Sequence, residues 1–365
     1  MTQYKKLVSA NGGKEIHAII TITDNTLPFS EQTARIKKEY DSLMKELGKE
    51  LCPVFIRWFL SDAANQAPSL PNLADCAVSI VEQPPLNLTK AALWVWLIEG
   101  VELSKIEEGV YAADHGNYRH ILSSGNNLPG LDSDTATYQM LKTTDQMLRK
   151  NEASLLENCV RTWFFVQNVD VNYSGVVSGR NRAFEELGLT PATRFIASTG
   201  IGGRHADRRS LVQMDTYSVK GILPEQMKQI GAPEFLNPTF EYGVAFERAT
   251  GIDYGDRRHL FVSGTASIDS MGDIVWEGDV KRQTLRMWEN VEALLGSAGC
   301  GWEDVGHIIV YLRDPADNSV VKDLFAKCFP DIPFVIVLAP VCRPGWLIEM
   351  ECMAMRPLKS EYPDF

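Results

Sequence analysis

The spacing of apolar residues in the last third of the chain switches between the periods of a strand and of a helix. Continuous apolar runs rich in β-branched residues are typical of buried strands, and apolar positions three and four residues apart are typical of helices. The pattern predicts strands at 259–264 and 306–313, helices at 279–295 and 319–328, a strand at 334–339 and a last strand from Trp346 onward.

The two closing strands contain the residues with the most evident chemical potential. A turn with Pro340, Pro344 and Gly345 separates them, so we expect a hairpin. Strand side chains repeat every two residues, which places Glu349 and Glu351 on one face. On spacing alone, a solvated sheet face is favoured over a functional site for these two glutamates, because charged residues are mostly exposed.

The same order of elements occurs earlier in the chain, as expected of an internal repeat. The second copy is predicted as strand 120–125, helix 134–150, strand 159–167, helix 178–187, strand 194–199 and strand 211–219. A more diverged copy opens the chain, with strand 17–22, helix 30–47, strand 53–60, a short helical segment near 63–67 and strands 76–81 and 90–97.

We therefore predict an α+β protein of three units, each a mostly antiparallel sheet with helices on one face. The predicted units are 1–104, which is degenerate, 105–232 and 233–357, followed by a tail at 358–365. Segments 107–118 and 221–238 are interpreted as linkers between units, and the tail from Lys359 as loose.

Composition and charge limit the classes of partner that the protein is expected to bind. The formal net charge of −11 disfavours nucleic acid as a partner, because phosphate backbones repel an acidic chain. Seven scattered cysteines without a CxxC pair favour reduced thiols and a cytoplasmic protein. No zinc motif, apolar leader or apolar run of membrane-spanning length is present, so we expect no metal, no cofactor and no membrane contact.

The third unit resembles the Rid superfamily, also called YjgF or endoribonuclease L-PSP. The resemblance is carried by HLFVSGTASID, HIIVYLRD and the closing PGWLIEMECMAM, and it weakens through the second unit to the first. Members of this superfamily form trimers with ligand sites in the clefts between subunits. Three copies in one chain therefore imply an internal trimer, a monomer with a pseudo-threefold axis, and further self-association is left open.

A narrower resemblance links the second and third units to the chorismatases, which hydrolyse the enolpyruvyl ether of chorismate. It is carried by SGRNRAFEELGL, FIASTGIG, EYGVAFERATG, FVSGTASIDSMGDIVWEGDV and VCRPGWLIEMEC. The sequence departs from those enzymes at NYSGVVS, where they have more aromatic residues, and in the shortened EYGVAFER.

A small carboxylate substrate requires a cationic partner, and guanidinium binds carboxylate in a bidentate fashion. The candidates are Arg180, Arg194, Arg248 and Arg343. Arg194 corresponds to the arginine that anchors the substrate carboxylate in Rid deaminases, although a surface arginine at a strand end fits equally well. The chorismatase-like Gly-Arg context makes Arg180 a somewhat stronger candidate.

Hydrolysis of an enol ether requires a carboxylic acid that partial burial keeps protonated. The resemblance places Glu349 at the catalytic glutamate position and Cys342 at a cysteine that some chorismatases have. A small buried thiol is the alternative for Cys342. Glu351 is expected to orient Glu349 or Arg343, or to meet solvent.

Main-chain and aromatic groups complete the predicted site. Ser198, Thr199 and Gly200 could offer main-chain donors to an anion, although a turn explains the glycine equally well. Tyr242 and Phe246 could form the wall of an apolar pocket around a ring, or simply belong to the core.

Three functions remain in view. The first is a chorismatase-like hydrolase or lyase acting on chorismate or a related cyclic or enolpyruvyl carboxylate, in a cleft between units two and three. The second is a Rid-type enamine or imine deaminase. The third is a protein that binds a small carboxylate without turning it over, so the sequence leaves open whether the chain is an enzyme.

Overall fold

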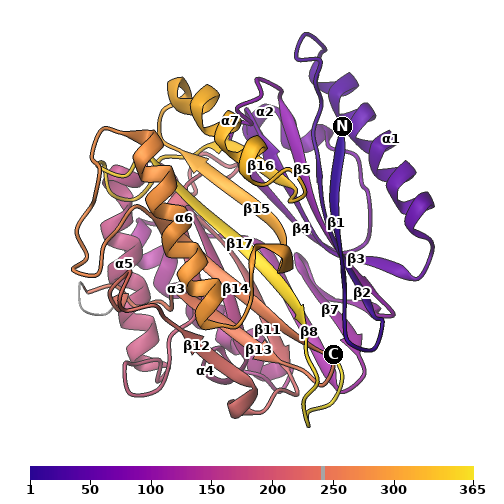
Figure 1. Cartoon of the computed structure of the whole chain (residues 1–365), viewed down its shortest axis with the longest axis vertical. Helices are drawn as coiled ribbons and strands as arrows, with labels where there is room; N and C mark the ends of the chain where they lie inside the picture. The colour runs from indigo at the N-terminus through magenta and orange to yellow at the C-terminus, as the bar shows by residue number, and fades with distance from the viewer. Residues whose placement is uncertain (240–242) are drawn as a thin grey trace.

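The computed structural model describes residues 1–239 and 243–365, and these fold into three sheets that follow one another along the chain (Figure 1). The first sheet has the order β1-β2-β5-β3-β4, the second β10-β9-β11-β8-β7-β6 and the third β12-β13-β14-β17-β15-β16. The mixed α+β class predicted from the sequence is confirmed.

The first sheet and the helices between its strands are β1 (Thr2–Val8), β2 (Lys14–Ile20), α1 (Phe29–Leu47), β3 (Leu51–Leu60), α2 (Ala63–Gln66), β4 (Ala77–Glu82) and β5 (Ala91–Glu99). The second sheet and its helices are β6 (Glu102–Glu107), β7 (Val110–His115), β8 (Tyr118–Asn127), α3 (Ser133–Lys150), α4 (Leu155–Asn158), β9 (Cys159–Val166), α5 (Val169–Glu186), β10 (Ala197–Gly202) and β11 (Val212–Lys220). The third sheet and its helices are β12 (Met227–Ile230), β13 (Ala249–Asp253), β14 (Arg257–Ala266), α6 (Val280–Ser297), β15 (Val305–Leu312), α7 (Asn318–Cys328), β16 (Phe334–Leu338) and β17 (Ile348–Pro357).

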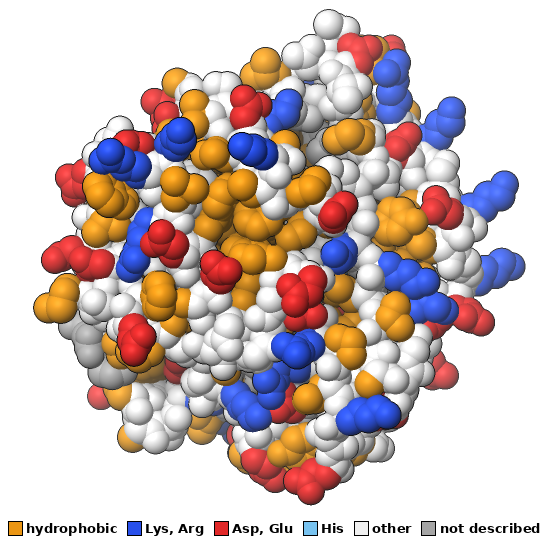
Figure 2. All heavy atoms as spheres, in the orientation of Figure 1, with side chains coloured by type: hydrophobic (Ala, Val, Ile, Leu, Met, Phe, Trp, Pro, Cys, Tyr) orange, Lys and Arg blue, Asp and Glu red, His pale blue; other side chains and the backbone are white. Residues whose placement is uncertain are grey.

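The long helices lie outside and the sheets meet inside. In Figure 1, α1 flanks the first sheet and α6 crosses β14 and β17. The opposite faces share one apolar core, in which Trp94 of the first sheet, Trp163 of the second and Tyr311 of the third are almost completely buried. On the face shown in Figure 2, acidic and basic side chains are interspersed and form no extended basic surface.

The predicted closing hairpin is wrong. β16 and β17 are not neighbours, because β15 lies between them, parallel to β16 and antiparallel to β17. β15 and β16 are joined through α7, because a parallel pair requires a crossover connection. After β16 the chain passes to the other side of β15, where it forms β17. The other two sheets repeat this arrangement, with β9 between β10 and β11 and β3 between β4 and β5.

The predicted linkers and loose tail are also wrong. Segment 107–118 contains β7 and segment 221–238 contains β12, and both strands pair within sheets. β1 was not predicted, because its exposed positions obscure the apolar pattern. The tail is held in place, since the side chain of Phe365 is 2% exposed and its main-chain N–H donates to Asp256 Oδ1 over 3.1 Å.

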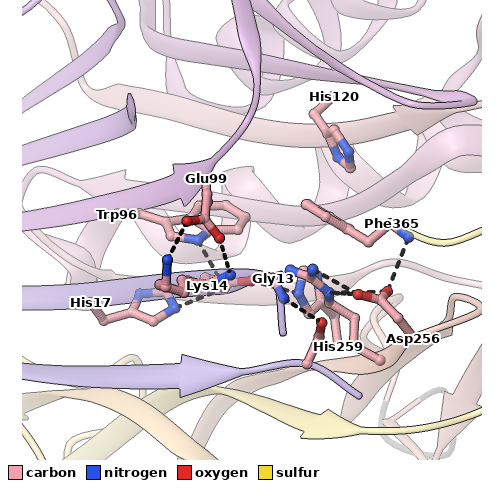
Figure 3. A network of polar contacts seen from close by, with 12 residues as sticks. Gly13, Lys14, His17, Trp96, Glu99, His120, Asp256, His259 and Phe365 are labelled. Carbon is pink, nitrogen blue, oxygen red and sulfur yellow. Dashed lines mark hydrogen bonds and ion pairs between the residues drawn. The ribbon is translucent and has the colours of Figure 1, made fainter. Parts of the chain in front are cut away.

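Phe365 closes one end of a buried polar network at the junction of the sheets (Figure 3). Glu15 lies in this network and accepts hydrogen bonds from Trp96 Nε1 over 2.9 Å and from His259 over 2.7 Å. Burial alone would raise the pKa of Glu15, but His259 and His17 hold it well below its usual value. The three sheets are therefore joined by polar as well as apolar contacts.

Candidate functional site

A cleft with an empty volume of about 540 Å³ lies where the second and third sheets meet. β10 and β14 form its base, because the Ser198 N–H donates to Ser263 Oγ over 2.8 Å and the Gly264 N–H donates to Thr199 Oγ1 over 2.9 Å. The lining residues are Tyr173, Arg180, Ser198, Gly200, Val244, Phe246, Arg248, Gly264, Ala266, Ile268, Cys342, Arg343, Trp346 and Glu349.

Glu349 extends from β17 into this cleft and is only 5% exposed. Gly264 on the neighbouring β14 makes room for it, because a Cβ at position 264 would collide with Oε1 of Glu349. Burial, and then the charge of Glu351, raise the pKa of Glu349 to about 8, against the opposing effect of Arg161 and Arg248. Glu349 is therefore largely a protonated acid at neutral pH.

Strand register identifies the equivalents of Glu349 in the other two sheets. Glu349 pairs with Tyr311, the residue before the last of β15. The residue that pairs at the same place is Gln213, opposite Phe165 in the second sheet, and Ala92, opposite Phe59 in the first. The acid is thus present at one of three equivalent strand positions.

Arg180 is the most unusual cation of the cleft. It lies on α5 and is 1% exposed, and its guanidinium stacks 5.7 Å from the ring of Phe246 and 5.9 Å from that of Phe164. Its Nε and Nη2 have no hydrogen-bond partner among the described residues. A buried guanidinium with two unpaired nitrogens is costly, so an anion in the cleft would stabilise it.

Two further predicted arginines line the same cleft. Arg248 donates to the carbonyl oxygen of Asn237 through Nε and Nη2, over 3.1 and 2.9 Å. Arg343 donates to the carbonyl of Gly272 over 3.3 Å and stacks on Trp346 at 4.7 Å. The cleft therefore combines three arginines with one carboxyl group, that of Glu349, which is largely protonated at neutral pH.

The structure does not bring Arg194 to this cleft. Arg194 lines a neighbouring cavity, and its guanidinium donates to the main-chain carbonyls of Cys159 and Phe195, the latter over 3.1 Å. The side chain thus ties β9 to the segment before β10. Main-chain carbonyls occupy the donors that were predicted to hold a substrate carboxylate.

Glu351 also lies outside the cleft lining, although it shares a face of β17 with Glu349. It is 3% exposed and accepts hydrogen bonds from Arg161 Nη2 and Trp163 Nε1, each over 2.8 Å. The solvated face that spacing alone favoured is therefore wrong for both glutamates, because β17 is an inner strand whose face is covered by the second sheet.

The remaining predicted residues are distributed around the site. Cys342, Ser198 and Gly200 line the cleft, and burial raises the pKa of the Cys342 thiol to about 12. The hydroxyl of Thr199 lies behind the lining and accepts from Arg161 Nη2 over 2.5 Å. Tyr242 falls outside the described residues.

Sequence reasoning missed two residues that shape the site. Arg161 is buried and pairs with Glu351, and Tyr173 reaches the cleft from α5. The signal for Arg161 was its place within the apolar run of β9, where an unpaired charge is not tolerated. Tyr173 had no such signal, because α5 begins well before its predicted start.

No group of side chains among the described residues is arranged to hold a metal ion. Within the same part of the chain, none of the helices combines the length and apolar character that spanning a membrane requires.

The fold and the cleft define an α+β protein built from three similar sheets, with a buried acid and arginines between two of them. The family model described as Endoribonuclease L-PSP matches residues 250–356. A RutC family protein of Pyrococcus abyssi is 37% identical over 100 residues, covering 27% of this chain and 78% of the relative. The 3-aminoacrylate deaminase RutC of Acinetobacter baylyi is 32% identical over 129 residues, covering 35% of this chain and 97% of that protein.

The chain belongs to this Endoribonuclease L-PSP family, the Rid or YjgF superfamily. A crystal structure of a chorismatase extends the likeness beyond one unit. It aligns with a TM-score of 0.65 and 22% identity, covering 84% of this chain and 94% of that structure. The two proteins therefore share their fold over nearly their whole length.

Proposed function

We propose that the protein is a chorismatase-like hydrolase that cleaves the enolpyruvyl ether of chorismate or of a related cyclic carboxylate. One observation carries the proposal: the buried acid Glu349 lines the same cleft as Arg180, whose Nε and Nη2 have no hydrogen-bond partner in the described part of the chain. The arginine calls for an anionic ligand, and a carboxyl group that stays protonated near neutral pH calls for acid catalysis. The resemblance to chorismatases in sequence and in fold supports the same reaction.

In the proposed reaction, Glu349 donates its proton to the methylene carbon of the enolpyruvyl group. The electrons of the C=C bond form the new C–H bond, and the ether oxygen stabilises the cation left on the adjacent carbon. Water then adds to this cation and returns a proton to the Glu349 carboxylate. The hydroxyl of the resulting hemiketal then gives up its proton and forms the C=O bond of pyruvate. The bond between the hemiketal carbon and the ether oxygen breaks, and this oxygen takes a proton and leaves on the ring as an alcohol.

The arginines orient the substrate in this scheme. Arg180 binds a substrate carboxylate through the two nitrogens that lack a partner among the described residues, and Arg343 is placed to bind a second one. Phe246 and Trp346 form apolar walls beside a planar ring. Cys342, a neutral thiol, shapes the pocket between Glu349 and the ring.

We further propose that the chain is an internal trimer with a pseudo-threefold axis, in which each unit contains one of the three sheets, so that the predicted boundaries at 104/105 and 232/233 move to the turns before β6 and β12. Equivalent register in the three sheets supports this arrangement. The equivalents of Glu349 are Gln213 and Ala92, so a single competent cleft is expected, between units two and three. Because one chain supplies the whole cleft, a monomer suffices, and the seven free cysteines fit a cytoplasmic protein.

The test is to incubate the folded protein with chorismate and to follow pyruvate. Release of pyruvate in step with loss of chorismate supports the proposal. Folded protein that binds chorismate, seen as a rise in melting temperature, but releases no pyruvate would instead indicate a non-catalytic carboxylate-binding protein. Absence of both binding and turnover contradicts the proposed substrate.

A Rid-type deaminase is a second candidate, because a relative named 3-aminoacrylate deaminase is matched over almost its full length. Arg180 would have to anchor the substrate carboxylate, since main-chain carbonyls occupy Arg194. The two reactions differ in nitrogen: a deaminase releases ammonia from 3-aminoacrylate, whereas chorismate contains no nitrogen. Measuring ammonia from one substrate and pyruvate from the other separates them.

A further inference from the structure

A buried network of four charged side chains lies behind the cleft and joins all three sheets. Arg57 of β3 pairs with Asp215 of β11 at 3.0 Å, and Arg161 of β9 pairs with Glu351 of β17 at 2.8 Å. Arg57 is also 3.7 Å from Glu351. None of the four side chains is more than 3% exposed, so solvent does not screen these interactions.

Arg161 connects this network to the acid in the cleft. Its Nη2 donates both to Glu351 and to Thr199 Oγ1, and Thr199 Oγ1 accepts in turn from the Gly264 N–H. Gly264 is the residue whose missing side chain makes room for the carboxyl group of Glu349. A permanent cation is therefore anchored within the group of residues that surrounds the proposed acid.

A cation in this place conflicts with acid catalysis. An arginine that pairs with a carboxyl group favours the carboxylate, and a carboxylate has no proton to donate. Glu351 provides Arg161 with a different partner, and Trp163 Nε1 fixes the second oxygen of Glu351 at 2.8 Å. Arg57 supplies a second cation beside Glu351, while Asp215 balances the charge of Arg57.

We propose that Glu351 is a positioning residue of the cleft: it holds Arg161 in an ion pair and so keeps this guanidinium from pairing with Glu349. Its value for catalysis rests on the proposed function, in which Glu349 must be protonated. The first sheet, which has no acid of its own at the equivalent position, contributes through Arg57.

The other groups near Glu349 do not substitute for Glu351. Arg161 from β9 and Arg248 from the segment before β13 both act to lower the pKa of Glu349. Tyr311 on β15 and Cys342 after β16 are neutral, since burial holds the pKa of each above its usual value. Arg180 and Arg343 are further cations of the cleft. The carboxylate of Glu351 opposes these cations, because its negative charge raises the pKa of Glu349.

The test is to titrate the carboxyl carbon of Glu349 by ¹³C NMR, with its signal assigned from the Glu349→Gln variant. Glu351→Gln removes the negative charge near Glu349 and breaks the ion pair that holds Arg161. The pKa of Glu349 is therefore expected to fall by about one unit or more. An unchanged or raised pKa overturns the proposal. This readout needs no turnover, so it decides the proposal even if chorismate is not the substrate.

Two further variants separate positioning from simple structural support. Asp215→Asn removes the other carboxylate of the network, which pairs with Arg57 and makes no hydrogen bond or ion pair with Arg161 among the described residues. This variant should shift the titration clearly less than Glu351→Gln. The double variant Arg161→Gln/Glu351→Gln removes both charges and should return the pKa of Glu349 toward that of the unaltered protein; failure to return overturns the proposal.

If Glu351→Gln does not fold, Arg161→Gln decides instead. It removes a cation that lowers the pKa of Glu349, so the pKa is expected to rise. A fall or no change would contradict the role given to Arg161, and with it the role of Glu351.

Discussion

Two side chains define the chemistry at the scale of single residues. Glu349 is buried and makes no hydrogen bond or ion pair with a cation in the described part of the chain, and burial favours its neutral form. Arg180 is equally buried, yet it cannot lose its charge, because a guanidinium stays protonated in proteins. A neutral acid and a cation with two nitrogens unpaired among the described residues lie in one cleft. This pair favours a ligand that is anionic at one end and accepts a proton at the other.

The protonation of Glu349 predicts the pH dependence of turnover. Because the proposed acid acts in its protonated form and its pKa is raised to about 8, kcat should be level near pH 7 and fall as the pH rises through about 8. The measurement is kcat for pyruvate release between pH 6 and 10. A rate that increases across this range would show that the carboxylate, as a base, is the active form.

The guanidinium of Arg180 predicts opposite effects on binding and stability, because two of its nitrogens lack a partner among the described residues. Arg180→Met keeps much of the side-chain volume and removes a buried charge without a described partner, so the free protein should become more stable by about 1–3 kcal/mol. Binding of a carboxylate should weaken, by at least about tenfold. Urea unfolding and thermal shifts with chorismate measure the two effects.

The matched control for this variant is Arg194→Met. Arg194 donates to main-chain carbonyls and does not line the cleft, so its replacement should lower stability and leave ligand affinity unchanged. Equal loss of affinity in both variants would contradict the assignment of Arg180.

At the scale of elements, two neighbouring strands of the third sheet shape the cleft. β17 carries Glu349 and β14 carries Gly264, and the acid occupies the space that a side chain at 264 would fill. The position of the carboxyl group thus depends on a glycine in the adjacent strand. A close approach of this kind is one of the reasons for a glycine inside a strand.

Gly264→Ala should therefore damage activity far more than stability. A methyl group would displace the carboxyl group of Glu349, and a displacement of about 1 Å is expected to lower kcat by about 100-fold. Gly296→Ala is the matched control, because position 296 in α6 has open space around it, and it should keep full activity. Loss of activity in both variants, or in neither, would contradict the role of Gly264.

Much of the order of elements was predictable from the sequence, but the order of strands within each sheet was not. Local periodicity correctly gave α1, α3, α6 and most of the strands, but it missed β1, β6, β7, β12 and β13. Chain proximity suggested that β16 and β17 pair, whereas β15 lies between them. The hydrophobic pattern indicates which face of a strand is buried, but it does not indicate which strand lies beside it in the sheet.

The same limit explains the outcome for the site residues. Glu349 and Glu351 lie two residues apart on the same face of β17, yet Glu349 lines the cleft and Glu351 pairs with Arg161. Arg194 matched a family position, but its donors are used by the main-chain carbonyls of Phe195 and Cys159. Long-range partners decide both cases, and a single sequence does not contain them.

At the scale of the whole molecule, the last residues of the chain join the three sheets. Phe365 packs 4.6 Å from His120 of the second sheet and 4.9 Å from His259 of the third, measured between ring centroids. Its neighbour Asp364 accepts a hydrogen bond from Asn11, in the turn after β1, over 2.5 Å. The segment after β17 therefore stabilises the common core rather than hanging free (Figure 3).

Phe365→Ala should consequently destabilise the protein without changing the site. Removing a buried aromatic ring is expected to lower the free energy of unfolding by about 3 kcal/mol. Turnover at 25 °C should stay at the level of the unaltered protein, because Phe365 does not line the cleft. Urea unfolding measures the loss, and an unchanged free energy would contradict the anchoring role.

The most direct measurement of the central claim is the rate of pyruvate release from chorismate by the protein and by Glu349→Gln. Glutamine keeps the size of the side chain but cannot donate a carboxyl proton, so kcat should fall by at least about 100-fold while KM stays nearly the same. Glu292→Gln, the same change on an exposed surface of α6, is the control and should be fully active. Full activity of Glu349→Gln would contradict the account.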